Sequence, residues 1–138
     1  MAAHGVRWVL PWLLLFAGSA CARGDEAAQV AEAFVTRYYV EANLTEARAL
    51  ATGLAQDKLA REIDLIQGVP RTSQTMDRTI TYRLAGEKRV GQGKIFYVYD
   101  LMITASGRSF RRRTTIATGQ ENGRWWVTNY LESPLEGP

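Results

Sequence analysis

Cysteine and histidine are nearly absent from this sequence of 138 residues, which has one of each, Cys21 and His4. A single cysteine excludes an internal disulfide. One cysteine with one histidine also excludes a zinc site built from these two residue types. We therefore expect no bound metal and no other cofactor.

The sequence also has no large excess of positive over negative residues, or of negative over positive ones. The formal net charge is +3, which is too small by itself to imply a nucleic-acid partner. Hydrophobic residues make up 46% of the chain and charged residues 22%, the balance of a globular domain. At roughly 100–200 residues per domain, the length allows one domain, which excludes a large enzyme with separate cofactor and substrate domains.

The N-terminus lacks a hydrophobic run long enough to cross a membrane. The apolar stretch over residues 8–17 is about half as long as the roughly 20 residues that a spanning helix needs. Arg7 precedes this stretch and small residues follow it, which is typical of an export signal. The sequence therefore predicts a signal peptide over residues 1–22 and a single mature domain over residues 23–138.

The only cysteine stands at the end of this signal. Ser19, Ala20 and Cys21 resemble the lipobox of bacterial lipoproteins, in which the cysteine is lipidated, although Gly18 stands where leucine is usual. The resemblance implies a lipid anchor at Cys21 and a place in the bacterial cell envelope. Two alternatives stay open: Ala20 to Ala22 also form an A-x-A site, whose cleavage would release a secreted or periplasmic protein, or the leader stays uncleaved in the cytosol.

The mature chain changes character near its middle. Residues 27–38 place apolar side chains at spacings of three and four, as in a helix that starts near residues 24–26 and is broken at residues 43–45. Thr45 is expected to cap a short second helix that is weakened by Gly53, and a third helical segment covers residues 56–67. From residue 76 onward the pattern is that of strands, so the order of elements predicts an α+β fold.

The strand region predicts an antiparallel meander. We expect strands over residues 79–84, 90–104, 108–118 and 124–131, with a turn at residues 85–87 and a bulge or sharp bend near Gly91 and Gly93. Asn122 and Gly123 match a type I′ hairpin turn. In the last strand, alternation places Trp125, Val127 and Leu131 on one face and Trp126, Thr128 and Tyr130 on the other.

Two or three N-terminal helices packed on a strongly bent antiparallel sheet of about four strands resemble the nuclear-transport-factor-two-like superfamily. The residues from Asn122 to Val127 look like its "Gly, basic, Trp, any, Val" ending, and residues 30–35 and 47–50 look like its first two helices. The resemblance covers most of residues 25–132. It implies a cone whose helices cover the concave face, whose mouth can hold a small molecule, and which often forms homodimers through the sheets.

Some members of that superfamily are enzymes with an Asp or His beside Tyr in the pocket. Here the only histidine lies in the removable signal, which leaves Asp100, near Tyr82, Tyr97 and Tyr99, as the one weak catalytic candidate. Burial in an apolar strand would raise the pKa of Asp100 and make it a base. The alternative is a structural ion pair between Asp100 and an arginine on the neighbouring strand.

The arginine run beside Phe110 supplies the remaining candidate. Alternation turns Arg112 to the same face as Phe110, while Arg111 and Arg113 face outward to solvent or acidic lipid head groups. Arg112 could hold an anionic ligand or pair with Asp100. The candidate ligand-binding residues are therefore Arg112, Tyr82, Tyr97 and Tyr99.

These observations favour a non-catalytic, lipid-anchored binding domain whose partner is a protein or a small hydrophobic ligand. One alternative is a small pocket enzyme, isomerase-like or cyclase-like, that acts on a lipophilic molecule. Another is an accessory subunit of an envelope secretion or lipid-transport assembly, which predicts a filled mouth and an apolar exposed sheet face. Whether the outer sheet face is covered by a second copy stays open.

Overall fold

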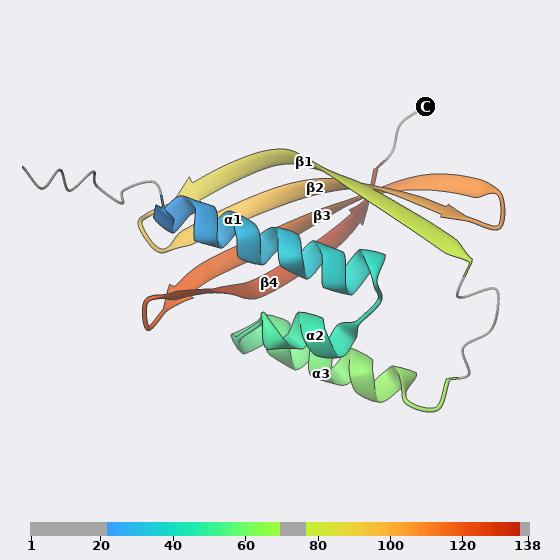
Figure 1. Ribbon diagram of the computed structural model, residues 1–138, viewed down its shortest axis with the longest axis horizontal. Helices are drawn as coiled ribbons and strands as arrows, with labels where there is room; N and C mark the ends of the chain where they lie inside the picture. Colours follow the sequence, from blue (N-terminus) through green and yellow to red (C-terminus); the bar gives the residue numbers. More distant parts are fainter. Residues whose placement is uncertain (1–21, 70–76, 136–138) are drawn as a thin grey trace, which may run out of the picture.

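A computed structural model describes residues 22–69 and 77–135. Helices come first and strands second, so the predicted α+β order is confirmed (Figure 1). The helical part comprises α1 (Ala22–Val35), the π-helical turn η1 (Thr36–Val40), α2 (Leu44–Ala49) and α3 (Gly53–Ile66). The strands are β1 (Arg78–Val90), β2 (Lys94–Ala105), β3 (Arg108–Glu121) and β4 (Arg124–Pro134).

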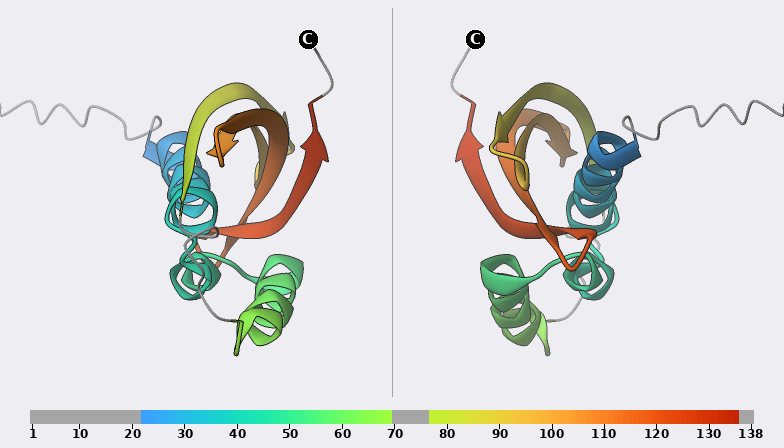
Figure 2. Two further views of the ribbon diagram at one scale, coloured as in Figure 1. Left: turned by 90° about the vertical axis from the view of Figure 1, so that its right-hand side faces the viewer. Right: turned by 90° about the vertical axis from the view of Figure 1, so that its left-hand side faces the viewer.

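The four strands form one antiparallel sheet in the order β1-β2-β3-β4. Figure 2 shows that this sheet curls strongly and that α1 lies against its concave side, while α2 and α3 lie beyond the β4 edge. The hydrophobic core fills the space between α1 and the sheet. The bent, helix-covered sheet is therefore as the sequence predicted.

The first helix ends differently from its predicted pattern. Ala27, Ala31, Phe34 and Val35 are buried as the apolar stripe requires, but the helix then widens into η1, where the Glu41 N–H bonds to the Thr36 carbonyl at 2.9 Å. The extra residue in a π turn rotates the following side chains around the helix axis. As a result Tyr39, which lies outside the predicted stripe, is buried beside the half-buried Tyr38.

The second helix is capped by Asn43 and not by Thr45 as expected. The Asn43 side-chain oxygen accepts a hydrogen bond from the Glu46 N–H at 3.1 Å, which satisfies a free donor of the first turn. Gly53 does not lie in this helix either. Its φ of 57° is the left-handed conformation that glycine adopts freely, and α3 begins there.

The segment between α2 and α3 is fixed to the edge of the sheet. The Val127 N–H bonds to the Leu50 carbonyl at 2.9 Å, and the Thr52 N–H bonds to the Val127 carbonyl at 2.9 Å. These bonds satisfy backbone groups that an edge strand would otherwise leave open. They place Leu50 beside the start of β4.

The turn predicted at residues 85–87 is wrong. β1 continues through this segment to Val90, and a bulge between Leu84 and Gly86 absorbs one extra residue. The reversal lies at residues 91–93, where Gly91 has a φ of 65°. The glycines assigned to a bulge or sharp bend inside a strand therefore form the turn between two strands, and the segment assigned to a turn holds the bulge.

The hairpin between β3 and β4 is as predicted, with positive φ values at Asn122 and Gly123. The predicted facing of β4 is wrong beyond Val127. A bulge opposite Ala117 and Thr118 shifts the register, so Tyr130 turns into the core and Leu131 turns outward with 62% of its surface exposed. One inserted residue reverses every later side chain of a strand.

Cys21 and all of the predicted signal peptide except Ala22 fall within residues 1–21, outside the described residues, and Ala22 is the first residue of α1. Among residues 22–69 and 77–135, none of the helices has the length and apolar character needed to cross a bilayer.

Candidate functional site

The concave face of the sheet is filled by side chains. Phe34 from α1 and Tyr97, Leu101 and Ile116 from β2 and β3 are almost completely buried against one another. A core packed in this way leaves few voids larger than a water molecule. Of the tyrosines predicted as ligand contacts, Tyr97 and Tyr99 therefore lie within a packed core, and Tyr82 is half-buried at its edge.

Tyr82 and Tyr99 lie together on this face, as the sequence indicated. Their ring centroids are 5.9 Å apart in an edge-to-face arrangement. The Tyr82 hydroxyl donates to Glu32 at 3.1 Å and lies 3.1 Å from the Thr36 hydroxyl. Burial raises the pKa of Tyr99, with a further contribution from the negative charge of Glu32.

A second polar cluster, which we call the tyrosine–glutamate cluster, comprises Tyr38, Glu62 and Tyr130. The Tyr38 hydroxyl donates to Glu62 Oε2 at 2.7 Å, and the Tyr130 hydroxyl donates to Oε1 at 2.6 Å. Burial raises the pKa of both phenols, and the hydrogen bonds to Glu62 raise it further. Both tyrosines are therefore neutral proton donors at physiological pH.

Lys58 closes one side of the tyrosine–glutamate cluster. Its ammonium group lies 4.0 Å from the centroid of the Tyr130 ring and contacts the Tyr130 carbonyl. Because α3 carries both Lys58 and Glu62, these contacts fix α3 to β4. Sequence reasoning missed this cluster, and the signal that could have indicated it is a tyrosine inside an otherwise apolar helical stripe.

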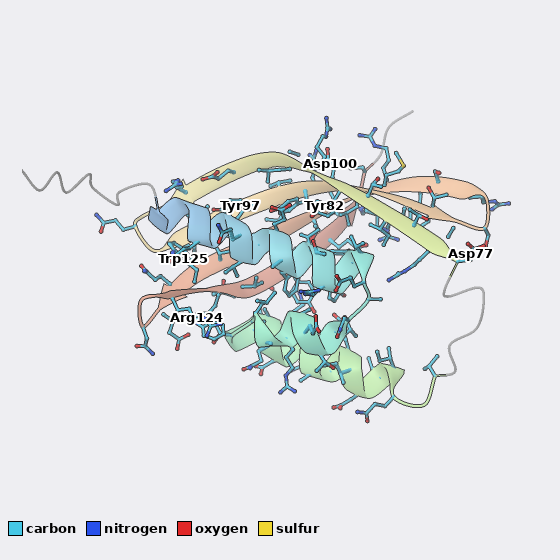
Figure 3. The ribbon with its side chains drawn as sticks, in the orientation of Figure 1. Asp77, Tyr82, Tyr97, Asp100, Arg124 and Trp125 are labelled. Carbon is cyan, nitrogen blue, oxygen red and sulfur yellow. The ribbon has the colours of Figure 1, made fainter. Side chains whose placement is uncertain are left out.

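Asp100 lies on the opposite, convex face (Figure 3). Arg113 Nε donates to its Oδ1 at 2.8 Å, and an Arg83 Nη donates to Oδ2 at 3.3 Å. The hydrogen bond from Arg113, opposed in part by burial, lowers the pKa of Asp100 instead of raising it. Two hypotheses were open for Asp100, a catalytic base and a structural ion pair. The structure shows the ion pair, with arginines of both neighbouring strands.

Arg112 pairs with Glu132, at 3.0 Å, and not with Asp100. Its guanidinium group also lies 5.8 Å from the centroid of the Phe110 ring. With 42% of its side chain exposed, Arg112 lies opposite Leu101 in the register, on the concave face at the edge of the packed core. The structure therefore does not bring Arg112 together with Tyr97, whose side chain is buried.

No protein-family model matches the sequence, and no curated protein matches it. Solved structures do match. A ketosteroid isomerase-like protein from Erwinia carotovora atroseptica superposes with a TM-score of 0.59 over 82% of this chain and 96% of its own, at 16% identity. The protein from Thiobacillus denitrificans assigned to a calcium/calmodulin-dependent protein kinase type II association domain gives 0.55 over 77% and 93%, at 14% identity.

The chain has the nuclear-transport-factor-two-like fold. At this level of identity the likeness concerns the fold alone. The chemistry available to this nuclear-transport-factor-two-like domain therefore depends on its own side chains.

Surface hollows formed by the described residues lie outside the packed core of the domain. One of about 300 Å³ on the convex side is lined by Asp100, Arg83 and Arg111, so the Asp100 ion pair meets solvent there. Another of about 510 Å³ lies between the start of α2 and the end of α3. The third, of about 400 Å³, lies between α1 and the start of β4.

Within the described ranges, no three His, Cys, Asp or Glu side chains gather as metal ligands would. The described carboxylates with close partners are held by arginines or phenols, except Glu121, which accepts a hydrogen bond from the Thr52 hydroxyl at 3.3 Å. The arrangement offers hydrogen-bond donors and apolar surface.

Proposed function

We propose that this chain is a non-catalytic binding domain of the nuclear-transport-factor-two-like fold, and that its partner is a protein or a small hydrophobic ligand. The observation that carries the proposal is the packing of Phe34, Tyr97, Leu101 and Ile116 on the concave face. A reaction inside the cone needs room for a substrate, and these side chains occupy that room.

The charged groups support binding over catalysis. A general base must be free to accept a proton from a substrate within hydrogen-bond reach. Asp100 is held by two arginines on the convex face, and each oxygen of Glu62 accepts a hydrogen bond from a phenol. The isomerase-like alternative would need one of these carboxylates to be released.

Occupancy of the concave face can be tested directly. We expect crystals of the full chain under xenon pressure to show no xenon between α1 and the sheet. A Leu101→Ala variant provides the positive control, because an apolar cavity left by a truncated core side chain stays dry and binds xenon. Xenon bound there in the unmodified chain would contradict the proposal.

Turnover gives an independent test. The full chain is incubated with an unconjugated unsaturated ketone, and conjugation of the double bond is followed by ultraviolet absorbance. We expect the rate in buffer alone. A faster rate that falls in Asp100→Asn or Glu62→Gln would establish the isomerase-like alternative.

We propose further that the domain is attached to a bacterial membrane by lipidation of Cys21. The support is the small-residue sequence before this single cysteine, at the end of an export-type leader. Acyl chains attached there would anchor the protein by burying methylene groups in the bilayer.

An accessory subunit of an envelope assembly is a second candidate, and the convex face favours it. Leu131 and Met102 are exposed there, and Phe96, Val98 and Trp126 are half-buried. A photo-crosslinker placed at Leu131 should yield adducts in native membranes, whereas one at the exposed Asp57 of α3 should not. An adduct with a second copy of the chain would indicate a homodimer through the sheets.

A further inference from the structure

The convex face of the sheet is strongly positive. Residues opposite one another in the strand register share a face, so the row through Arg83, Asp100 and Arg113 identifies the side chains on the convex side. Two carboxylates lie on this face, those of Asp100 and Glu121. Its cationic side chains are Arg83, Lys88, Lys94, Arg111, Arg113 and Arg124.

The helical part of the domain has the opposite sign. Residues 26–69 contain four positive and seven negative side chains. The charges are therefore separated in space, with a basic convex sheet face and an acidic helical part. Such a separation orients a molecule at a charged surface.

The positive charge of the convex face is not neutralised within the described chain. Lys88, Lys94 and Arg111 are exposed, and none of them forms an ion pair with a described carboxylate. The arginines that hold Asp100 outnumber it two to one. This face therefore has charge to offer to a negatively charged partner.

Apolar side chains lie between these cations. Met102, Leu131 and Val90 are exposed on the convex face. Trp126 is half-buried there, with the Arg124 guanidinium group 4.2 Å from its ring centroid. Basic side chains beside tryptophan and aliphatic ones are typical of surfaces that lie at the boundary between lipid head groups and acyl chains.

The convex hollow of about 300 Å³ offers a place for an anionic group. Arg83 lines it from β1 and Arg111 from β3, and Thr81 lies opposite Arg111 across β2. Asp100 also lines the hollow, but Arg113 holds its charge. Two guanidinium groups and a hydroxyl are donors that the oxygens of a phosphodiester accept.

The proposed lipid anchor lies at one end of the sheet. β1 and β3 end, and β2 and β4 begin, at the end where α1 starts (Figure 1). Lys94 and Arg124 are the first residues of β2 and β4, so they stand at that end. Because α1 starts at Ala22, an acyl chain on Cys21 would bring these two cations to the bilayer surface.

We propose that the convex face lies against the surface of an anionic phospholipid bilayer. Its cations contact head-group phosphates, one of which enters the hollow between Arg83 and Arg111, while Met102 and Leu131 point toward the acyl chains. The inference rests on the proposed membrane attachment and names the face that the domain presents to the lipid. A protein partner on the same face is the alternative outcome.

Vesicle binding tests the inference without the lipid anchor. The full chain with Cys21→Ser cannot be acylated at that position. It is sedimented with vesicles of equal parts phosphatidylglycerol and phosphatidylcholine, or of phosphatidylcholine alone. We expect tighter binding to the anionic vesicles, and weaker binding when salt is raised from about 50 mM to about 500 mM, because salt screens exposed charges.

Matched charge variants separate the face from the net charge. Arg111→Gln and Lys88→Gln each remove one convex cation, so each should lower the affinity for anionic vesicles about fivefold, the contribution of one basic residue near such a surface. Arg61→Gln removes the same charge from the exposed side of α3 and should change little. The leader is common to all variants, so differences among them report on the domain.

A fluorescent label reports the orientation. The chain with Cys21→Ser contains no other cysteine, so one labelling site can be added at a time. A polarity-sensitive fluorophore attached through Leu131→Cys should shift to the blue on anionic vesicles. The same label attached through Leu65→Cys, at an exposed position of α3, should not shift.

Three results would overturn the inference: equal binding to both kinds of vesicle, equal losses in Arg111→Gln and Arg61→Gln, or equal blue shifts of the two labels. Absence of vesicle binding together with a protein adduct at Leu131 would assign the face to a protein partner and would also refute it. The lipid anchor is decided separately, because cell fractionation of Cys21→Ser follows acylation and the vesicle experiments contain none.

Discussion

Single residues in this protein show how burial and pairing set the character of an ionisable group. Tyr38 and Tyr130 are buried phenols with raised pKa values, and their shared acceptor is Glu62 on α3. Asp100 lies between two arginines and has a lowered pKa. The first arrangement connects three elements of the fold, and the second connects three adjacent strands.

Replacing Glu62 by Gln should destabilise the domain by about 1–3 kcal/mol. Hydrogen bonds to a charged acceptor contribute roughly 1.5–3 kcal/mol each, reduced here because Glu62 is only half-buried. Urea unfolding followed by circular dichroism measures the change. Glu46→Gln is the control: this carboxylate is exposed and pairs with the exposed Arg37, so its loss should cost at most about 0.5 kcal/mol. Equal effects would show that the two phenols do not depend on the charge of Glu62.

Replacing Asp100 by Asn should change how the free energy of unfolding depends on pH. The pKa of Asp100 is lowered in the folded protein from the unfolded value near 3.9, so its contribution is complete above that value. It is lost as the pH falls through the folded pKa. The difference in unfolding free energy between the unmodified chain and Asp100→Asn should therefore be constant from about pH 7 to 5 and shrink below about pH 4. A difference that grows in acid would mean that the carboxyl is destabilised by burial.

At the scale of elements, the sequence predicted the helices and strands and misplaced their irregularities. Periodicity identified the buried residues of α1, and the Asn122–Gly123 pair identified a turn, because both signals are local. The bulges in β1 and β4 and the π turn depend on what the chain packs against, which no local pattern records. Each bulge inserts one residue into a strand, and the π turn rotates the side chains that follow it. As a result, the predicted burial of Tyr39, Tyr130 and Leu131 differs from the observed burial.

The same reason explains what was and was not predicted of the candidate site. Tyr82 and Tyr99 were found because strand alternation places them on one face. Glu62 was missed because its phenol partners come from η1 and β4, far away in the sequence. The hollow between α1 and the start of β4 was missed because three separate elements form it.

The register that the β4 bulge sets can be tested by comparing a buried leucine with an exposed one. Leu59 on α3 is completely buried, whereas Leu131 faces outward beyond the bulge. We expect Leu59→Ala to cost about 2–5 kcal/mol and Leu131→Ala to cost less than about 0.5 kcal/mol. Both are measured by urea unfolding. A large cost at Leu131 in a dilute monomer would contradict the observed register, while one that appears only at high protein concentration would show that a second copy covers it.

At the scale of the whole molecule, the surfaces available for binding lie outside the cone. The helices cover the packed part of the concave face, the convex face carries exposed apolar side chains beside arginines, and a hollow lined by Trp125 lies at the end of the sheet where α1 begins. Because α1 starts at Ala22, directly after Cys21, a lipid at that cysteine would hold this end of the domain at the membrane. The hollow lined by Trp125 would then lie close to the membrane surface.

This arrangement depends on lipidation, which a single substitution tests. In bacterial cells that express the full chain, the unmodified protein should fractionate with membranes, and Cys21→Ser should move to the soluble pool because it cannot be acylated. Each buried methylene of an acyl chain contributes about 0.8 kcal/mol, and no described helix can replace such an anchor. Intact mass distinguishes the alternatives: an unmodified product that starts at Arg23 in both strains would show cleavage at the A-x-A site, and retention of the whole leader would show that the chain is not processed.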